Sequence, residues 1–186
     1  MKNYKFCIFT DIQVTIISDS ICKYIKGIHY TEVKAFPGAN ISRLTWKIQK
    51  DKSLISKPFT ILHVGTNDIS QKDLSIEKII SLYNNLITFI QENSKTEVIV
   101  SSVLPRPVDL MLTEYKVKET NRRLRSKCLQ RRVKFVASYH PFLKGGKPVT
   151  ELFAVRDGGL HLNFEGIRKL KSIFVNVVSH LPLNGK

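Results

Sequence analysis

The chain has 186 residues, 42% of them apolar and 24% charged, which is enough for one domain with a sizeable core and too few for two ordinary domains. This composition excludes a disordered tail, and the absence of any run near the ~20 apolar residues of a spanning helix excludes a membrane-spanning protein. The 30 Lys and Arg residues against 15 Asp and Glu residues give a net charge of +15, which favours an anionic partner such as nucleic acid, an acidic lipid surface or an acidic protein.

The N-terminal segment and the three cysteines bear on where the protein is located. Residues 1–12 are expected to form a lead-in segment, and residues 13–186 are expected to form one domain. The lead-in is slightly basic, but its apolar run is too short for a signal peptide, which favours a soluble, intracellular protein. Cys7, Cys22 and Cys128 cannot all pair within the chain and lack the spacing of metal ligands, so we expect reduced thiols.

Short apolar runs alternate with longer amphipathic stretches along the chain. In chain order, the predicted elements are strand 13–18, strand 30–36, helix 42–49, strand 59–65, helix 75–91, strand 97–104, helix 112–130, strand 134–137 and helix 165–178. Continuous β-branched runs are typical of strands buried on both faces of a parallel sheet. The alternation therefore predicts right-handed βαβ units in an α/β protein, arranged as a three-layer α/β/α sandwich.

Polar residues follow the predicted strands at the edge where such sheets bind ligands. Ser20 follows the first strand, Gly38 the second and Asn67 the third, while Asp157 and His161 precede the last helix. Each alone has a plainer interpretation, as a helix N-cap, a turn glycine, a turn-stabilising amide or a surface histidine. Together they supply a nucleophile, oxyanion donors and a base with an orienting acid, which are the groups that an acyl-transfer site requires.

Four short blocks resemble the successive blocks of the SGNH, or GDSL-type, hydrolases. They are IISDSI at 16–21, FPGANI at 36–41, HVGTNDI at 63–69 and DGGLHLN at 157–163. The resemblance covers about residues 13–180, nearly the whole chain. It implies a flavodoxin-like sheet of five parallel strands and serine-dependent hydrolysis of esters, without a metal or another cofactor.

The resemblance also implies a role for each residue that matches the family's blocks. Ser20 would be the nucleophile, His161 the general base and Asp157 its partner. The oxyanion hole would consist of the Ser20 N–H, the Gly38 N–H and the Asn67 side-chain amide. The substrate would be an ester of acetyl or another short acyl group, with an alcohol that belongs to a lipid, a sugar or a modified protein.

The sequence departs from the family's pattern at two places. Ser18 stands where the family usually has glycine, and it adds a side chain close to the nucleophile turn. Three residues separate Asp157 from His161, where the family usually has two. The paired Gly158 and Gly159 can absorb the extra residue as a small bulge. Otherwise the carboxylate would miss the ring, and a backbone carbonyl would orient the histidine.

The blocks are also similar to esterase domains in the first open-reading-frame protein of some vertebrate LINE-type retrotransposons. There the domain belongs to a larger nucleic-acid-binding protein, so other domains of a parent protein are expected as partners. The positive charge and the lack of a signal peptide fit that setting. The alternative is a catalytically weak or inactive SGNH-fold scaffold, or a basic module that binds nucleic acid or membrane.

Basic residues recur on one side of the long helix predicted at 112–130. Lys118, Arg122, Arg125 and Arg132 are separated by steps of four, three and seven, which predicts a single outward stripe that nothing obviously neutralises. The plain interpretation is a solvated surface. The other is a weak, salt-sensitive contact with RNA or acidic lipid that does not read bases.

Several other polar residues near the blocks have structural interpretations. His63 lies within a strand, so we expect a buried, hydrogen-bonded histidine rather than a second base. Asp19 and Asp68 flank the site residues and are expected to hold turns by accepting bonds from backbone N–H groups. Cys22 is expected to be a small buried residue rather than a nucleophile.

Overall fold

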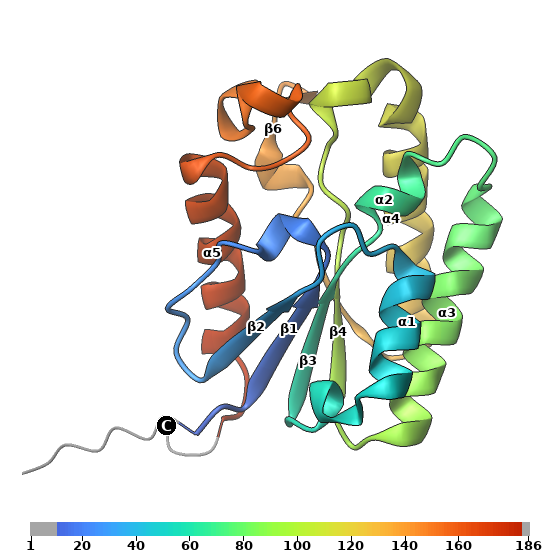
Figure 1. Ribbon diagram of the computed structural model, residues 1–186, viewed down its shortest axis with the longest axis vertical. Helices are drawn as coiled ribbons and strands as arrows, with labels where there is room; N and C mark the ends of the chain where they lie inside the picture. The colour runs from blue at the N-terminus through green and yellow to red at the C-terminus, as the bar shows by residue number, and fades with distance from the viewer. Residues whose placement is uncertain (1–10, 184–186) are drawn as a thin grey trace, which may run out of the picture.

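In the computed structural model, which describes residues 11–183, a five-stranded sheet lies between two helical layers (Figure 1). Its strands are β1 (Val14–Ser18), β2 (Thr31–Ala35), β3 (Phe59–His63), β4 (Glu97–Ser101) and β5 (Lys134–Val136). All neighbouring strands are parallel, in the order β2-β1-β3-β4-β5. The predicted sandwich is confirmed. Most of the expected lead-in, including Cys7, lies outside the described residues.

Helices cover the two faces of the sheet unequally. One face carries α1 (Ile41–Lys50), α3 (Ile76–Asn93) and α4 (Leu110–Gln130), which stand side by side on the right of Figure 1. The other face carries α5 (Phe164–Ser179). The short helix α2 (Thr66–Ile69) follows β3. A two-stranded hairpin of β6 (Leu143–Lys144) and β7 (Lys147–Pro148) follows β5.

The central strands are apolar throughout because each face of the sheet packs against helices. Ile17 and Leu62 join the cluster under α1, α3 and α4, whereas Ile16 and Ile61 join the cluster under α5. All four side chains are fully buried. Removing each from water contributes about 1.5–3 kcal/mol, so the cores on both faces of the sheet stabilise the sandwich.

The ends of the elements follow local chemistry. Asn40, Ser75 and Asn163 cap α1, α3 and α5 by accepting bonds from backbone N–H groups of the first turn. β3 ends at His63, two residues before the predicted end, because Gly65 adopts a φ of 118°. The ring and hydroxyl of Tyr83 fill the space that a side chain at Gly65 would need. This packing sets the sharp turn that leads into α2.

The long basic helix is shorter at its C-terminus than the predicted stripe requires. α4 ends at Gln130, and Arg132 adopts a left-handed φ of 56° beyond it. The Val133 N–H then bonds to the Cys128 carbonyl at 2.8 Å, which closes the helix end in a Schellman-type turn. The prediction that Arg132 extends the stripe along the helix is therefore wrong.

The expectation that nothing neutralises the stripe is also wrong for two of its members. Lys118 pairs with Glu114 at 2.5 Å, and Arg122 pairs with Glu119 at 2.7 Å, both one turn away on α4. The Arg125 side chain makes no hydrogen bond or ion pair with any other residue that the structure describes. No helix within residues 11–183 is long and apolar enough to cross a membrane.

Candidate active site

The turn after β1 presents Ser20 at the carboxyl edge of the sheet. β1 ends at Ser18, and Ser20 opens a short 3-10 turn that Asp19 caps by accepting a bond from the Ile21 N–H at 3.0 Å. Ser18, where the family usually has glycine, is fully buried and turned into the fold. Its hydroxyl donates to the Asp19 carbonyl and accepts from the Cys22 N–H. The additional side chain thus supports the turn from within.

His161 lies between Ser20 and Asp157 in one hydrogen-bonded row. Its Nε2 is 2.9 Å from the Ser20 Oγ, although the two residues are 141 positions apart in the chain. Its Nδ1 is 2.7 Å from an Asp157 carboxylate oxygen. The imidazole side chain is 38% exposed, so a substrate carbonyl can approach the pair from solvent. The three residues predicted as nucleophile, base and acid are therefore in mutual contact.

The paired glycines close the longer connection between Asp157 and His161. Gly158 and Gly159 adopt left-handed φ values of 68° and 90°. The chain consequently curls around the Asp157 carboxylate, which accepts bonds from the N–H groups of Leu160 at 3.0 Å and His161 at 3.3 Å. The bulge brings the carboxylate to the ring, and the alternative of a backbone carbonyl at the histidine is not observed.

The Asp157 carboxylate is held in its charged form. Burial alone would raise its pKa, but the bonds from the His161 ring and from the two backbone N–H groups outweigh burial and lower the pKa below its usual value. An ionised carboxylate accepts from Nδ1–H, which leaves the lone pair of Nε2 directed at the Ser20 hydroxyl. The electrostatics thus favour the tautomer that a general base requires.

The loops after β2 and β3 meet beside this row. Gly38 is exposed and has a left-handed φ of 72°. Asn67 lies on α2, and its side-chain amide donates to the Ala39 carbonyl at 2.8 Å. A primary amide has two N–H bonds, so one remains for another acceptor. The contact fixes the predicted amide donor beside the predicted backbone donor.

Two buried aspartates support these loops from below. Asp68 accepts the Ile41 N–H with both carboxylate oxygens, at 3.0 and 3.3 Å, which joins α2 to the first turn of α1. Asp19 is fully buried, and one of its oxygens has no partner. Burial raises the pKa of Asp19 to about 7 and that of Asp68 to about 6. Both hold turns, as expected from the sequence.

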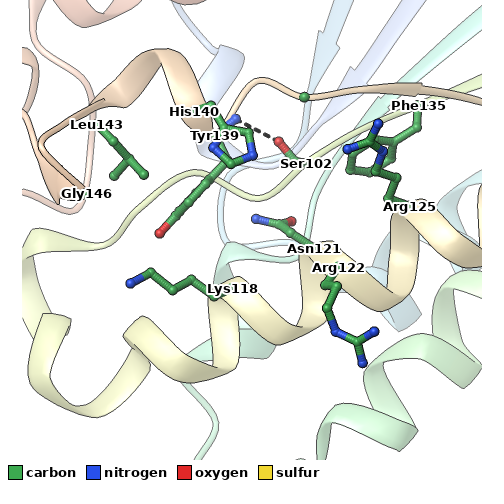
Figure 2. Close-up of a pocket in the computed structure, with 11 residues that line it drawn as sticks. Ser102, Lys118, Asn121, Arg122, Arg125, Phe135, Tyr139, His140, Leu143 and Gly146 are labelled. Carbon is green, nitrogen blue, oxygen red and sulfur yellow. Dashed lines mark hydrogen bonds between the residues drawn. The ribbon is translucent and has the colours of Figure 1, made fainter.

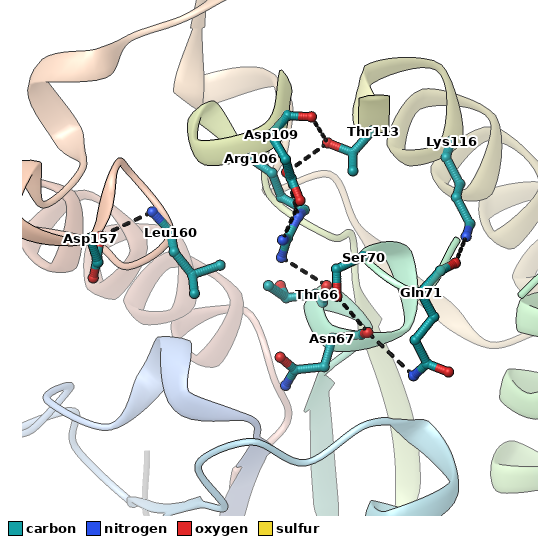
Figure 3. Close-up of polar contacts among 10 residues, drawn as sticks. All are labelled: Thr66, Asn67, Ser70, Gln71, Arg106, Asp109, Thr113, Lys116, Asp157 and Leu160. Carbon is teal, nitrogen blue, oxygen red and sulfur yellow. Dashed lines mark hydrogen bonds and ion pairs between the residues drawn. The ribbon is translucent and has the colours of Figure 1, made fainter. Parts of the chain in front are cut away.

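Arg106 is a buried cation that the sequence analysis did not single out. Its Nη1 donates to the Thr66 carbonyl at 2.9 Å, next to Asn67 in the chain (Figure 3). Its Nε and Nη2 hold both carboxylate oxygens of Asp109, at 2.9 and 2.7 Å. The side chain thereby links the segment after β4 to the start of α2. The sequence signal was an arginine between two prolines directly after a buried strand.

His63 is buried within β3, and its Nδ1 is 2.8 Å from the Ser101 hydroxyl. Burial lowers its pKa to about 4, so the ring is neutral at physiological pH. The expectation of a structural histidine is confirmed. Cys22 and Cys128 are free and buried, and residues 11–183 contain no group of three or more His, Cys, Asp or Glu side chains arranged to hold a metal.

No protein-family model and no curated protein sequence matches the chain, but solved structures do. A GDSL-like lipase from Bacteroides thetaiotaomicron matches with a TM-score of 0.76 at 17% identity, over 91% of this chain and 88% of the lipase. The fold is that of the GDSL-type hydrolases. A G-D-S-L family lipolytic protein from Veillonella parvula matches with a TM-score of 0.76 at 19% identity, over 90% of this chain and 98% of its own. A catalytic mutant of an acetylxylan esterase from Geobacillus stearothermophilus matches with a TM-score of 0.71 at 12% identity, over 93% of this chain and 96% of the esterase.

Proposed function

We propose that this protein is a carboxylic ester hydrolase that uses Ser20 as its nucleophile. The observation that carries the proposal is the continuous row from the Ser20 hydroxyl through the His161 ring to the Asp157 carboxylate. Such a row activates a hydroxyl that is otherwise a weak nucleophile at neutral pH. Its place at the carboxyl edge of a parallel sheet also suits a substrate site.

The reaction would proceed through an acyl-enzyme. The Ser20 Oγ attacks the ester carbonyl while His161 Nε2 accepts the hydroxyl proton. The Ser20 N–H, the Gly38 N–H and the free N–H of the Asn67 amide stabilise the negative oxygen of the tetrahedral intermediate. The intermediate collapses as His161 returns the proton to the leaving alcohol. A water molecule, deprotonated by His161, then releases the acyl group as a carboxylic acid.

The solved structures support the choice of reaction and of substrate class. Their descriptions include a GDSL-like lipase, a putative acylhydrolase and an acetylxylan esterase. Two of them are catalytic mutants of one acetylxylan esterase, in which either an aspartate or a serine is replaced by alanine. We therefore propose acetyl or other short acyl esters as substrates, with a lipid as one source of the alcohol.

We also propose a cellular setting from the sequence blocks and the charge. Their similarity to esterase domains of LINE-type retrotransposon proteins suggests that the domain acts within a longer, intracellular nucleic-acid-binding protein. The net charge of +15 supports RNA or an anionic membrane surface as a partner of that protein. Expression of the full reading frame, followed by sedimentation with RNA at low and physiological salt, would test this setting.

The test of the enzymatic proposal compares wild-type protein with Ser20→Ala on a short-chain chromogenic ester. The matched control is Ser126→Ala, since Ser126 is exposed on α4 and its hydroxyl makes no hydrogen bond with another described residue. We expect wild type and the control to hydrolyse the ester, and Ser20→Ala to be inactive. A serine-directed phosphonate should label Ser20 in mass spectrometry. Wild type that neither hydrolyses esters nor reacts with the phosphonate would instead support the inactive scaffold.

A further inference from the structure

A cavity lies at the carboxyl edge of the sheet, beyond β4 and β5 and away from the row of Ser20, His161 and Asp157. It has a volume of about 490 Å³ and is enclosed by α4, the segment from β5 to His140 and the β6–β7 hairpin (Figure 2). No residue of the Ser20, Asp157 and His161 row lines it. Its volume is within the range of roughly 300–1,000 Å³ that small-molecule pockets occupy. The cavity is therefore large enough for a ligand of its own.

Two polar side chains of this cavity, Asn121 and Ser102, bond to the backbone. Asn121 accepts a bond from the Val103 N–H at 2.9 Å and donates one to the Val103 carbonyl at 2.8 Å. Ser102 accepts the Tyr139 N–H at 2.8 Å. Phe135, Ala137 and Leu143 supply the apolar part of the lining. A ligand rich in hydrogen-bonding groups would leave them unpaired here, at about 1–3 kcal/mol for each group.

Cations stand at the mouth of the same cavity. The Arg125 side chain has no hydrogen-bond or ion-pair partner among the described residues, whereas Lys118 pairs with the half-exposed Glu114 and Arg122 pairs with the mostly buried Glu119, both on α4. A solvent-exposed pair such as Lys118–Glu114 contributes roughly 0–1 kcal/mol, so an incoming anion can replace that carboxylate. The Lys118 ammonium and the Tyr139 hydroxyl point toward one another in Figure 2 and offer donors on one side of the mouth.

The apolar surface continues beyond the cavity. A second hollow of about 400 Å³ shares Arg122, Arg125 and Phe135 with the first, and Leu129 also lines it. Leu129 is 80% exposed, so its side chain extends the apolar surface of the cavity. The two hollows together form an elongated trough with cations along its rim. An extended aliphatic chain matches that shape better than a compact base does.

We propose that this trough binds a single-chain anionic lipid, such as a fatty acid or an alkyl phosphate. The head group would bind Arg125 together with Arg122 or Lys118, and the chain would lie against Phe135, Leu143 and Leu129. A nucleotide is the alternative ligand, because Asn121 keeps one amide N–H and Ser102 keeps its O–H beyond their bonds to the backbone, and the test below separates the two. The proposal does not depend on the esterase activity, since the trough and the Ser20 row share no residue.

The test is calorimetric titration of the full chain carrying Ser20→Ala, which cannot turn over an ester. Dodecanoate and dodecyl phosphate, kept below their critical micelle concentrations, are the probes. Dodecanol tests the need for charge, and uridine monophosphate and a short oligouridine test the nucleic-acid alternative. We expect both anions to bind with one-to-one stoichiometry, dodecanol to bind at least 10-fold more weakly, and neither nucleotide probe to displace dodecanoate.

Two variants locate the binding. Arg125→Glu should weaken the binding of dodecanoate at least 10-fold. Ala137→Phe, which fills the cavity, should weaken the binding of both dodecanoate and dodecanol at least 10-fold. Lys26→Glu is the matched control for charge, because Lys26 is exposed in the loop before β2 and lies outside the trough. Circular dichroism checks that each variant is folded. An affinity for dodecanoate that is unchanged in both trough variants would overturn the proposal. Displacement of dodecanoate by oligouridine would overturn it as well.

Discussion

The two ends of the sheet's carboxyl edge use polar side chains in opposite ways. Beyond β1, β2 and β3, the side chains of Ser20, His161 and Asp157 bond to one another in a half-exposed row. Beyond β4 and β5, Asn121 and Ser102 bond to the backbone and leave an apolar trough. The same edge of the sheet therefore carries a connected row of side chains at one end and side chains tied to the backbone at the other.

Asp157, which belongs to the row, and Asp19, which precedes Ser20, show the same contrast. Asp157 is partly exposed and accepts three bonds, which lower its pKa. Asp19 is fully buried with one unpaired oxygen, and burial raises its pKa to about 7. Asp19 and Asp157 therefore differ in charge near neutral pH, although both are aspartates close to Ser20. We expect this difference in charge to affect ester turnover through Asp157 and the pH dependence of stability through Asp19.

The largest effect is expected from Asp157→Asn. The asparagine can donate its N–H₂ to Nδ1, which moves the ring proton to Nε2 and removes the lone pair that Ser20 needs. We expect turnover of a short-chain ester to fall by an order of 10⁴ at neutral pH. Asp73→Asn, at an exposed position outside the site, is the control. Near-normal activity of Asp157→Asn would transfer the orienting role to another group and leave the esterase proposal standing.

A smaller loss is expected from Asn67→Ala. This change removes one donor to the oxyanion and the bond to the Ala39 carbonyl, while the Ser20 and Gly38 N–H groups remain. We expect kcat to fall by roughly 10²–10³, with a smaller change in KM, because the donor acts mainly on the transition state. Steady-state kinetics on the same ester measure both constants. A change confined to KM would show that the amide binds the substrate instead.

Arg106→Met is expected to reduce kcat by about 10-fold to 10²-fold, since Arg106 positions the start of α2 without contacting the reacting atoms. Arg106→Lys should recover less than half of the loss, because an ammonium cannot make the fork with Asp109 and reach Thr66 at once. Full recovery by lysine would reduce the role to charge alone. Thermal unfolding of each variant separates lost positioning from lost folding.

The smallest effect concerns stability and pH. The pKa of Asp19 is raised from 3.8 to about 7 by burial, so the folded state keeps a proton that the unfolded state releases. The stability that this proton contributes is complete below pH 4 and is lost as pH rises toward 7. The free energy of unfolding of wild type minus that of Asp19→Asn should therefore decrease by up to about 1.4 kcal/mol per pH unit in that window.

The difference between variant and wild type is the quantity to measure, because His63 acts in the opposite direction. Its pKa is lowered to about 4, so it destabilises the fold as pH falls below 6.5. That contribution is present in both proteins and cancels in the subtraction. Urea unfolding at several pH values between 4.5 and 7.5 gives the difference. A value that stays constant across this range would show that Asp19 is ionised throughout.

The sequence by itself determined the features that repeat along the chain. Continuous apolar strands such as 59–63 require cover on both faces, and amphipathic helices supply it, so the parallel sandwich follows from local patterns. The same patterns place Ser20, Asn67 and His161 after strands or before a helix, and therefore at one edge. The acids that pair with Lys118 and Arg122 lie four and three positions away in the sequence, so helical spacing alone could have predicted these pairs.

Only the tertiary structure decided how distant segments meet. Whether Asp157 reaches His161 depended on the left-handed Gly158 and Gly159, which pack against the segment after β4. The bond from Arg106 to Thr66 joins residues 40 positions apart, and the trough is lined by residues of α4, of β5 and of the segments after it. Periodicity reports which face of an element is apolar, but it holds no information on the depth or direction at which two elements pack. That is why the row of Ser20, His161 and Asp157 was predictable from its motifs, whereas the trough and the unpaired Arg125 side chain were not.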